Sequence, residues 1–232
     1  MRVWVTRAEP GAEATARRLR ELGHHPLISP VLEVRGLDAV VDFNGVGAVA
    51  FTSANAVRAA PPAAYDYPAF TVGDATAQAA RDAGIEHVFS AQGDASALVD
   101  LLREQAPLIR DDILYLCARE PAADLVGMLR ERSHGGVRAR QAAVYATISA
   151  EPVEALESLG SLDAALVHSP KAARRLVELL DPAAVPALAF ACISDAAAAP
   201  LRAAGHEKVL AAPFPDEAAL LKLLEDDQTH RV

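Results

Sequence analysis

The sequence has few of the residues that mark metal, redox or membrane proteins. Its two cysteines form no CxxC pair, and its histidines show no spacing typical of metal ligands, so we expect no metal site and place the histidines on the surface or in loops. No apolar run approaches the length of a membrane span. The first residues, MRVWVTRAEPG, lack the hydrophobic region of a signal peptide. We therefore expect a cytoplasmic protein that does not enter a membrane.

Motifs that bind cofactors or activate nucleophiles are also missing. Gly73 stands outside any GxGxxG pattern, and the chain has no Walker A sequence, nucleophile elbow or paired-carboxylate signature. Cys117 and Cys192 lie in short apolar runs without a neighbouring histidine, which favours reduced structural thiols over a disulfide or a nucleophile. The sequence thus predicts no cofactor. The same absence fits an enzyme that acts by positioning its substrate and a protein that only binds one.

Positive charge is scarce as well. The chain has 22 lysine and arginine residues against 31 aspartate and glutamate residues, a net charge of −9, and it has no basic stripe. Such a surface argues against nucleic-acid binding, which depends on cations that neutralise phosphates. An acidic protein can still bind an acidic small molecule through the backbone N–H groups at the amino ends of its helices.

What the chain does contain is a repeated stretch. From Ala48 to Ala91 it reads AVAFTSANAV and then FTVGDATAQAARDAGIEHVFSA, and from Ala164 to Ala212 it reads AALVHSPKAARRL and then FACISDAAAAPLRAAGHEKVLAA. Each copy alternates short apolar runs, typical of strands buried on both faces, with Ala-rich amphipathic helices. The chain therefore uses one supersecondary unit twice.

Small polar residues stand where the predicted strands of both copies pass into helices. In a parallel α/β sheet these junctions share the carboxyl edge, where ligands bind. Residues of this kind are Ser53, Thr76, Ser169 and Ser194. We expect them to line two rims, which enclose a cleft if the rims face one another. Helix capping is the alternative role, and the two roles can coexist.

We predict an α/β fold of two similar domains, each with a parallel sheet of about five strands flanked by helices, joined by a two-stranded β linker. Residues 1–34 and 150–232 form the first domain, because the two amino-terminal strands have no repeat partner beside them and complete the carboxyl-terminal sheet. Residues 37–148 form the second, inserted domain. Pro30 breaks the apolar run from Pro26 to Val34 or keeps it at a sheet edge.

In their order, the motifs resemble those of the uroporphyrinogen-III synthase family, whose members close hydroxymethylbilane into the asymmetric uroporphyrinogen III. The matching pieces are VTRAEPGAEATARRLRELG, SPVLEV, FTSANAV, TVGDATAQAARDAG, GDASALVDLL, LYLCAREPAADLVGMLRERS, VYAT, VHSPKAARRL and APFPDEAALLKLL, which cover nearly the whole chain. The resemblance implies two α/β domains with the active site in the cleft between them, a small-molecule substrate, and neither cofactor nor metal. We expect a monomer.

Tyr145, in VYAT, matches the tyrosine that family members carry near the returning linker. The resemblance implies that its phenol, which is protonated at neutral pH, donates a hydrogen bond or a proton to the water that leaves the substrate. From the residues alone, the alternative is an amphipathic tyrosine that ends a buried strand with its hydroxyl in water.

The substrate of the family carries carboxylates on every ring, so the polar strand exits are candidate binding residues. They are Arg7, Thr52, Ser53, Asn55, Thr76, Ser169, Lys171 and Ser194. Arg7 pairs either with a substrate carboxylate or with Glu9 or Glu13 at the surface. Lys171 either adds a cation for the substrate or solvates the start of a helix.

One segment departs from the family pattern. Where many members have Gly-Pro-Thr-Thr, this chain has Ser194-Asp195-Ala196-Ala197, in which Ser194 can replace one hydroxyl. Three interpretations of the chain follow: a uroporphyrinogen-III synthase, a two-domain α/β binding or sensory module for an anionic small molecule without turnover, and a family member that has lost its activity.

Overall fold

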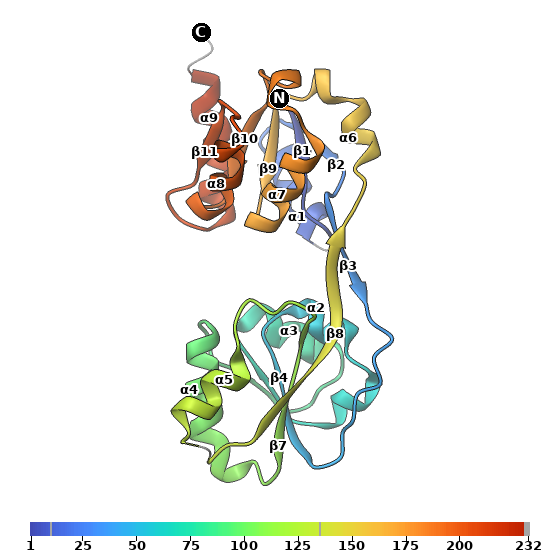
Figure 1. The fold of residues 1–232 in the computed structure, drawn as a ribbon, viewed down its shortest axis with the longest axis vertical. Coiled ribbons are helices and arrows are strands. Elements are labelled where there is room, and N and C mark those ends of the chain that lie inside the picture. The colour runs from blue at the N-terminus through green and yellow to red at the C-terminus, as the bar shows by residue number, and fades with distance from the viewer. Residues whose placement is uncertain (10, 135, 230–232) are drawn as a thin grey trace. The chain divides into compact units, whose positions relative to one another are not determined.

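The computed structural model describes residues 1–9, 11–134 and 136–229, and the chain divides into two compact units (Figure 1). Unit 1 contains Met1–Glu33 and Ile148–Val232, and unit 2 contains Val34–Thr147. The chain passes from unit 1 into unit 2 within β3 (Leu32–Gly36) and returns within β8 (Ala139–Ser149).

Unit 1 is built on a five-stranded parallel sheet with the order β11-β10-β9-β1-β2. Its strands are β1 (Arg2–Val5), β2 (His25–Ile28), β9 (Ala164–Val167), β10 (Ala189–Cys192) and β11 (Val209–Ala211). Its helices are α1 (Gly11–Glu21), α6 (Val153–Glu157), α7 (Pro170–Leu179), α8 (Asp195–Ala203) and α9 (Glu217–Thr229), with 3-10 turns at Leu159–Ser161 and Pro182–Ala184. Every residue of β9 and β10 is buried, which explains why their sequences show no alternation.

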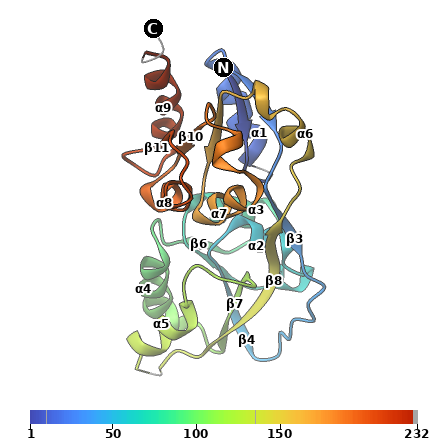
Figure 2. The ribbon, with the colours of Figure 1, turned by 45° about the horizontal axis from the view of Figure 1, so that its top comes forward.

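Helices cover both faces of this sheet. On one face, α1 and α9 contribute to a core that includes Val5 and Leu166. On the other, α7 and α8 lie side by side (Figures 1 and 2) over a core that includes Trp4 and Phe190. The fully buried Trp4 donates its indole N–H to the carbonyl oxygen of Ser29 at 2.6 Å, so its one polar atom is satisfied.

Unit 2 is built on a six-stranded sheet with the order β3-β8-β7-β4-β5-β6. Besides β3 and β8 its strands are β4 (Val46–Phe51), β5 (Ala69–Thr71), β6 (Val88–Ser90) and β7 (Asp112–Ala118), and β4 to β8 pair in parallel. Its helices are α2 (Ala54–Ala59), α3 (Asp74–Asp82), α4 (Ala95–Gln105) and α5 (Leu125–Arg132), with 3-10 turns at Pro62–Asp66 and Ala106–Leu108. The helices pack in pairs, α2 with α3 and α4 with α5 (Figure 2).

The two sheets share one strand order. Matching β9, β10, β11, β1 and β2 to β4, β5, β6, β7 and β8 places each strand of unit 1 on a strand of unit 2, with β3 as an additional edge strand. In each sheet, successive strands are added outward in opposite directions from a central pair, which is β1 and β9 in unit 1 and β4 and β7 in unit 2. Such a pair is the topological switch point, and ligands of open α/β sheets bind in the crevice at its carboxyl end.

The repeated stretch is also repeated in backbone geometry. Gly84 follows α3 with φ of 95°, and Gly205 follows α8 with φ of 92°. The next residue folds back in the same way in both copies: Ile85 N donates to the carbonyl of Ala80, and His206 N donates to that of Leu201, both at 3.1 Å. Both helices thus end in a left-handed glycine.

The structure confirms the predicted fold class, α/β with two parallel sheets flanked by helices. It also confirms the break at Pro30, because β2 ends at Ile28 and β3 begins at Leu32. β2 lies at the edge of the unit 1 sheet. Among the described residues, no helix is both long and apolar enough to cross a membrane.

Replacing either left-handed glycine tests the shared geometry. We expect Gly84→Ala and Gly205→Ala each to lower the free energy of unfolding by about 1–2 kcal/mol, because a Cβ is strained at positive φ. Gly160→Ala is the matched control, since Gly160 is exposed, has no positive φ and has open space around its Cβ position. Thermal unfolding followed by circular dichroism measures the difference. Equal midpoints for Gly205→Ala and Gly160→Ala would contradict the prediction.

Candidate functional site

The switch point of unit 2 carries a pair of hydroxyl groups. Thr52 follows β4, and its Oγ1 lies 2.8 Å from the Oη of Tyr115 in the neighbouring strand β7. Burial raises the pKa of Tyr115 because the phenolate would be poorly solvated, and the hydrogen bond to Thr52 opposes the rise. The pair is therefore neutral at physiological pH and can donate or accept hydrogen bonds.

Serines begin three of the helices that leave the carboxyl edges. Ser53, Ser169 and Ser194 are the N-caps of α2, α7 and α8. Their Oγ atoms accept hydrogen bonds from the backbone N–H groups of Asn55, Ala172 and Ala197 at 3.1, 3.1 and 3.3 Å. The capping role is thus confirmed for all three serines, and their contact with a substrate stays a prediction.

The amino end of α3 differs, because no side chain caps it. Its N-cap is Gly73, and among the described residues the backbone N–H groups of Asp74 and Ala75 donate to no acceptor. Thr76 lies buried in this first turn. An uncapped helix start keeps donors and partial positive charge for an anion. In the neighbouring α2, the side chain of Asn55 accepts a hydrogen bond from Arg58 at 3.3 Å.

Tyr145 lies in β8 at a bulge. Cys117 of β7 pairs with Ala143, whereas the next residue, Ala118, pairs with Tyr145, so β8 holds one extra residue there. Bulges change the direction of side chains and are common beside active sites. The Tyr145 side chain is mostly buried, with 8% of the residue exposed, and no hydrogen bond within the described residues occupies its hydroxyl. The strand continues past Tyr145 to Ser149, and the alternative in which the hydroxyl faces water stays open.

The switch point of unit 1 carries charged groups instead. We call Arg7, Thr15, His168 and Glu217 the Glu217 cluster, because the other three donate to its carboxylate. Thr15 Oγ1 lies 2.5 Å from Glu217 Oε1, and His168 Nε2 and Arg7 Nη1 lie 3.1 and 3.4 Å from Glu217 Oε2. Arg7 follows β1 and His168 follows β9, so the carboxylate joins the ends of the two central strands.

One of the two alternatives for Arg7 is wrong. Arg7 does not pair with Glu9 or Glu13: its partner is Glu217, and Glu13 pairs with Arg20 at 2.7 Å. Arg7 meets Glu217 at the start of α9, a contact between distant parts of the sequence that no local pattern predicts. His168 lies in the loop after β9, as predicted, and its side chain is 9% exposed.

Lys171 lies in the first turn of α7, next to the cap Ser169. Whether it contacts a substrate stays a prediction, as it does for Thr52, Asn55 and Thr76. Sequence reasoning missed Tyr115, His168 and Glu217 as members of the switch points. One signal was present, because aligning the two copies places His168 where the first copy has Thr52, directly before the capping serine.

The electrostatics of Glu217 follow from its neighbours. Burial alone would raise the pKa of its carboxyl group, but hydrogen bonds from His168 and Thr15 and the charges of His168 and Arg7 outweigh burial and lower the pKa to about 2. Glu217 is therefore ionised at any pH at which the protein works. The carboxylate holds its three donors in place.

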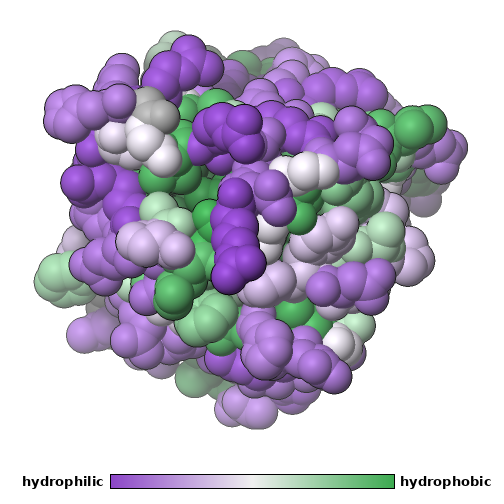
Figure 3. Space-filling model, turned by 90° about the horizontal axis from the view of Figure 1, so that it is seen from below, coloured by the Kyte–Doolittle hydropathy of each residue, from purple (hydrophilic) through white to green (hydrophobic). Residues whose placement is uncertain are grey.

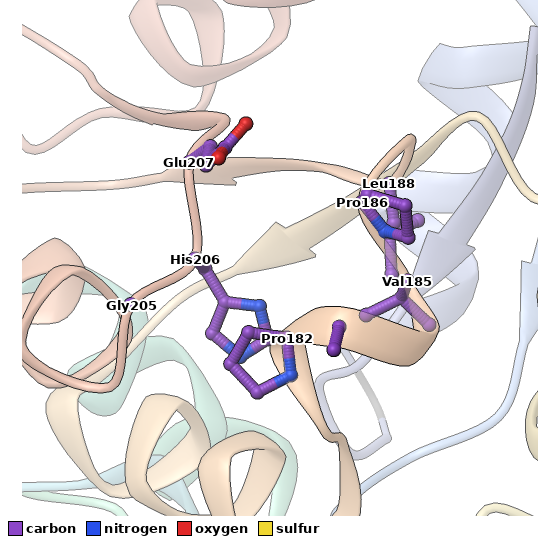
Figure 4. Close-up of a pocket in the computed structure, with 8 residues that line it drawn as sticks. Pro182, Val185, Pro186, Leu188, Gly205, His206 and Glu207 are labelled. Carbon is purple, nitrogen blue, oxygen red and sulfur yellow. The ribbon is translucent and has the colours of Figure 1, made fainter.

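A cavity of about 310 Å³ in unit 1 lies at the amino edge of the sheet, opposite the carboxyl edge (Figure 4). It is lined by Pro182, Ala183, Val185, Pro186, Leu188, Gly205, His206 and Glu207. These residues precede β10 and β11, so the cavity lies at the amino edge, away from the polar strand exits. Figure 4 shows the His206 ring beside Pro182, and its Nε2 is buried without a partner among the described residues.

A second cavity, of about 460 Å³, lies between α1 and α9, away from the polar strand exits, and is lined by Arg18, Glu21, Leu22, Ala218, Leu221, Lys222 and Glu225. Hydrophilic residues cover most of the face in Figure 3, and hydrophobic residues show between them. Within residues 1–9, 11–134 and 136–229, no group of three or more His, Cys, Asp or Glu side chains could hold a metal ion. The polar strand exits at the two switch points therefore remain the candidate functional site.

The two thiols lie in buried strands, as predicted, and both are free. Burial raises the pKa of Cys117 to about 11 and that of Cys192 to about 12, so neither forms a thiolate at neutral pH. We expect the native protein to react with Ellman's reagent at pH 8 far more slowly than the urea-unfolded protein, which exposes both thiols. A native thiol that reacts as fast as in urea would contradict the burial.

Glu217 gives the stability a defined dependence on pH. Its pKa is about 2 in the folded protein and 4.5 ordinarily, so the ionised form stabilises the fold above pH 4.5 and this contribution is lost as the pH falls towards 2. At about 1.4 kcal/mol per pH unit, the loss reaches about 3 kcal/mol. Glu217→Gln should lower the stability at pH 7 and weaken its dependence between pH 4.5 and 3. Urea titrations measure both, with the exposed Glu13→Gln as control.

Comparisons with known proteins agree with the fold. The family model described as Uroporphyrinogen-III synthase HemD matches residues 13–222. A solved uroporphyrinogen-III synthetase from Helicobacter pylori 26695 is 21% identical, with a TM-score of 0.66, over 97% of this chain and 98% of that chain. A mutant uroporphyrinogen III synthase from the extremely thermophilic bacterium Thermus thermophilus is 19% identical, with a TM-score of 0.53, over 99% of both chains.

These two structures show a shared fold. A comparison with curated protein sequences found no match. Because the family model matches most of this chain, residues 13–222, the chain belongs to the uroporphyrinogen-III synthase family.

Proposed function

We propose that this chain is a uroporphyrinogen-III synthase, a cytoplasmic lyase that converts hydroxymethylbilane into uroporphyrinogen III with loss of water. The observation that carries the proposal is the family match over residues 13–222, in a chain whose two sheets both end in polar switch points. The proposal takes the protein to be a monomer without cofactor or metal. It takes residues 1–34 with 150–232, and residues 37–148, as its two domains.

The reaction needs control of conformation more than reactive groups. Loss of the terminal hydroxyl as water leaves an electrophilic azafulvene carbon on the linear tetrapyrrole. Attack on this carbon by the free end of the far ring would yield the symmetric isomer. Attack by the substituted position of that ring instead gives a spiro intermediate, which fragments and recloses with the ring inverted. An enzyme that holds the chain for the second attack decides the isomer by positioning.

Tyr145 is the proposed hydrogen-bond or proton donor to the leaving water. Tyr145 lies next to the bulge in β8, its ring packs into the core of unit 2, and no described residue occupies its hydroxyl. A phenol is a weak acid, so it contributes only modest acceleration. Its removal should slow the reaction without abolishing it.

The carboxylates of the substrate are proposed to bind at the strand exits of both sheets. At the start of α3, the uncapped N–H groups of Asp74 and Ala75 can receive one carboxylate, beside Thr76. At the other exits the hydroxyls and side chains already have partners but keep further bonding capacity. The residues proposed to take part are Arg7, Thr52, Ser53, Asn55, Ser169, Lys171 and Ser194.

No observation favours a binding or sensory module over the synthase. The departure at Ser194 leaves a third possibility, a family member without activity, but Ser194 keeps the helix-capping geometry of Ser169. Both alternatives predict that the protein does not form the asymmetric isomer, so a single assay separates them from the synthase.

The decisive experiment supplies freshly generated hydroxymethylbilane, oxidises the products and separates uroporphyrin I from uroporphyrin III by chromatography. We expect mainly type III from the wild type. Tyr145→Phe should retain the type III product at a rate reduced by roughly tenfold to a hundredfold, the scale of a weak general acid. Tyr65→Phe is the matched control. The Tyr65 hydroxyl donates to the carbonyl oxygen of Val57 at 3.2 Å, and Tyr65 is not among the proposed site residues.

Each outcome has a definite meaning. Only type I, formed at the spontaneous rate by the wild type, would overturn the proposed function. A wild-type rate for Tyr145→Phe would remove Tyr145 from the mechanism and leave the function in place. An equal loss in Tyr65→Phe would show that the effect comes from lost packing in unit 2.

A further inference from the structure

We propose that Glu217 is a positioning residue that orients the guanidinium of Arg7 to bind a substrate carboxylate at the switch point of unit 1. The proposal rests on the proposed function, which supplies a substrate with carboxylates. It extends that function by dividing the work: Arg7 contacts the substrate, and Glu217 acts only through Arg7.

The cluster is graded from buried to exposed. The side chains of His168 and Glu217 are 9% and 16% exposed, whereas that of Arg7 is 37% exposed. The buried end is closed by Thr15 of α1, which donates to the other carboxylate oxygen. The arginine is thus the member of the cluster that a ligand can reach, and the inner members fix the carboxylate that holds it.

A second contact fixes the plane of the guanidinium. A Cβ built on Gly11 would lie nearest to Nη2 of Arg7 and 2.5 Å from its Nε and Cζ, so the guanidinium packs with its Nε–Nη2 side over the glycine at the start of α1. This helix start carries partial positive charge, which makes a cation there unfavourable by itself. Glu217 compensates part of that charge, and a bound anion would compensate the rest.

The guanidinium keeps the edge that carboxylates prefer. Arg7 uses Nη1 for Glu217, and among the described residues its Nε and Nη2 donate to no acceptor. The Nε and Nη2 donors together form a planar fork that binds a carboxylate in bidentate geometry. With Nη1 bonded to Glu217 and one face against Gly11, the direction of this fork is set before the substrate arrives, which lowers the cost of binding.

The two switch points bury different groups. The residue before the capping serine is His168 in unit 1, where it bonds Glu217, and Thr52 in unit 2, where its partner is the neutral Tyr115. The exposed Arg119 follows β7 as Arg7 follows β1, so unit 1 is distinguished by the Glu217 carboxylate that Arg7 bonds.

A double-mutant cycle on the whole protein tests the proposal. The variants are Arg7→Lys, Glu217→Gln and the double substitution, assayed for type III formation from hydroxymethylbilane. We expect Glu217→Gln to raise KM about tenfold, the scale of one charge-assisted hydrogen bond, with kcat within about twofold. The double variant should have the KM of Arg7→Lys, because Glu217 has no effect once the fork is lost.

Two controls separate positioning from stability. Glu13→Gln removes an exposed acidic partner from α1 and should leave KM unchanged. Gly205→Ala is expected to destabilise unit 1 without touching the cluster, so a KM rise in this variant would assign the effect to stability and overturn the proposal. Melting temperatures are recorded for all variants.

The remaining outcomes test this proposal and the proposed function separately. An active wild type with an unchanged KM in Glu217→Gln overturns this proposal alone, and so do additive effects on KM in the double variant. A wild type that yields only type I overturns the proposed function and this proposal with it. A tenfold rise in KM that disappears in the Arg7→Lys background supports both.

Discussion

The strand order of the two sheets is the constraint on which the rest of the structure depends. Because strands are added outward in opposite directions from a central pair, the helices that follow the two central strands leave on opposite sides of the sheet. The carboxyl ends of that pair therefore stay uncovered by their own connections. β1 and β9 are the pair in unit 1, and β4 and β7 in unit 2. The candidate polar groups lie near the carboxyl ends of these strands, and the buried cores lie between the sheets and their helices.

The two switch points meet the same physical demand in different ways. Polar atoms at the end of a buried strand lose water and need partners. Unit 2 satisfies them with the neutral pair of Thr52 and Tyr115, which costs little to bury. Unit 1 buries a carboxylate, which is costly unless it accepts several hydrogen bonds, and Glu217 accepts three. The positive charges of His168 and Arg7 offset that cost.

The chemistry proposed for the chain suits a protein without reactive side chains. Both thiols are buried and protonated, and the described residues hold no metal cluster. What the structure offers is geometry: capped helix starts, an uncapped start at α3, a tyrosine beside a bulge and an arginine bonded to a buried carboxylate. Choosing between two attacks on one carbon needs this kind of restraint, since the uncatalysed reaction already proceeds and only its regiochemistry must change.

The sequence by itself determined the fold class, the repeated unit and the capping serines, because these depend on local apolar runs, glycines and hydrogen bonds within one turn of helix. It also placed both cysteines in buried strands. Its alternative of Glu9 or Glu13 as the partner of Arg7 was wrong, and it did not indicate Tyr115 or Glu217. Arg7 and Glu217 are more than 200 residues apart, and they meet because α9 packs on the same face of the sheet as α1. The bulge at Tyr145 likewise depends on the register between β7 and β8, which no local pattern specifies.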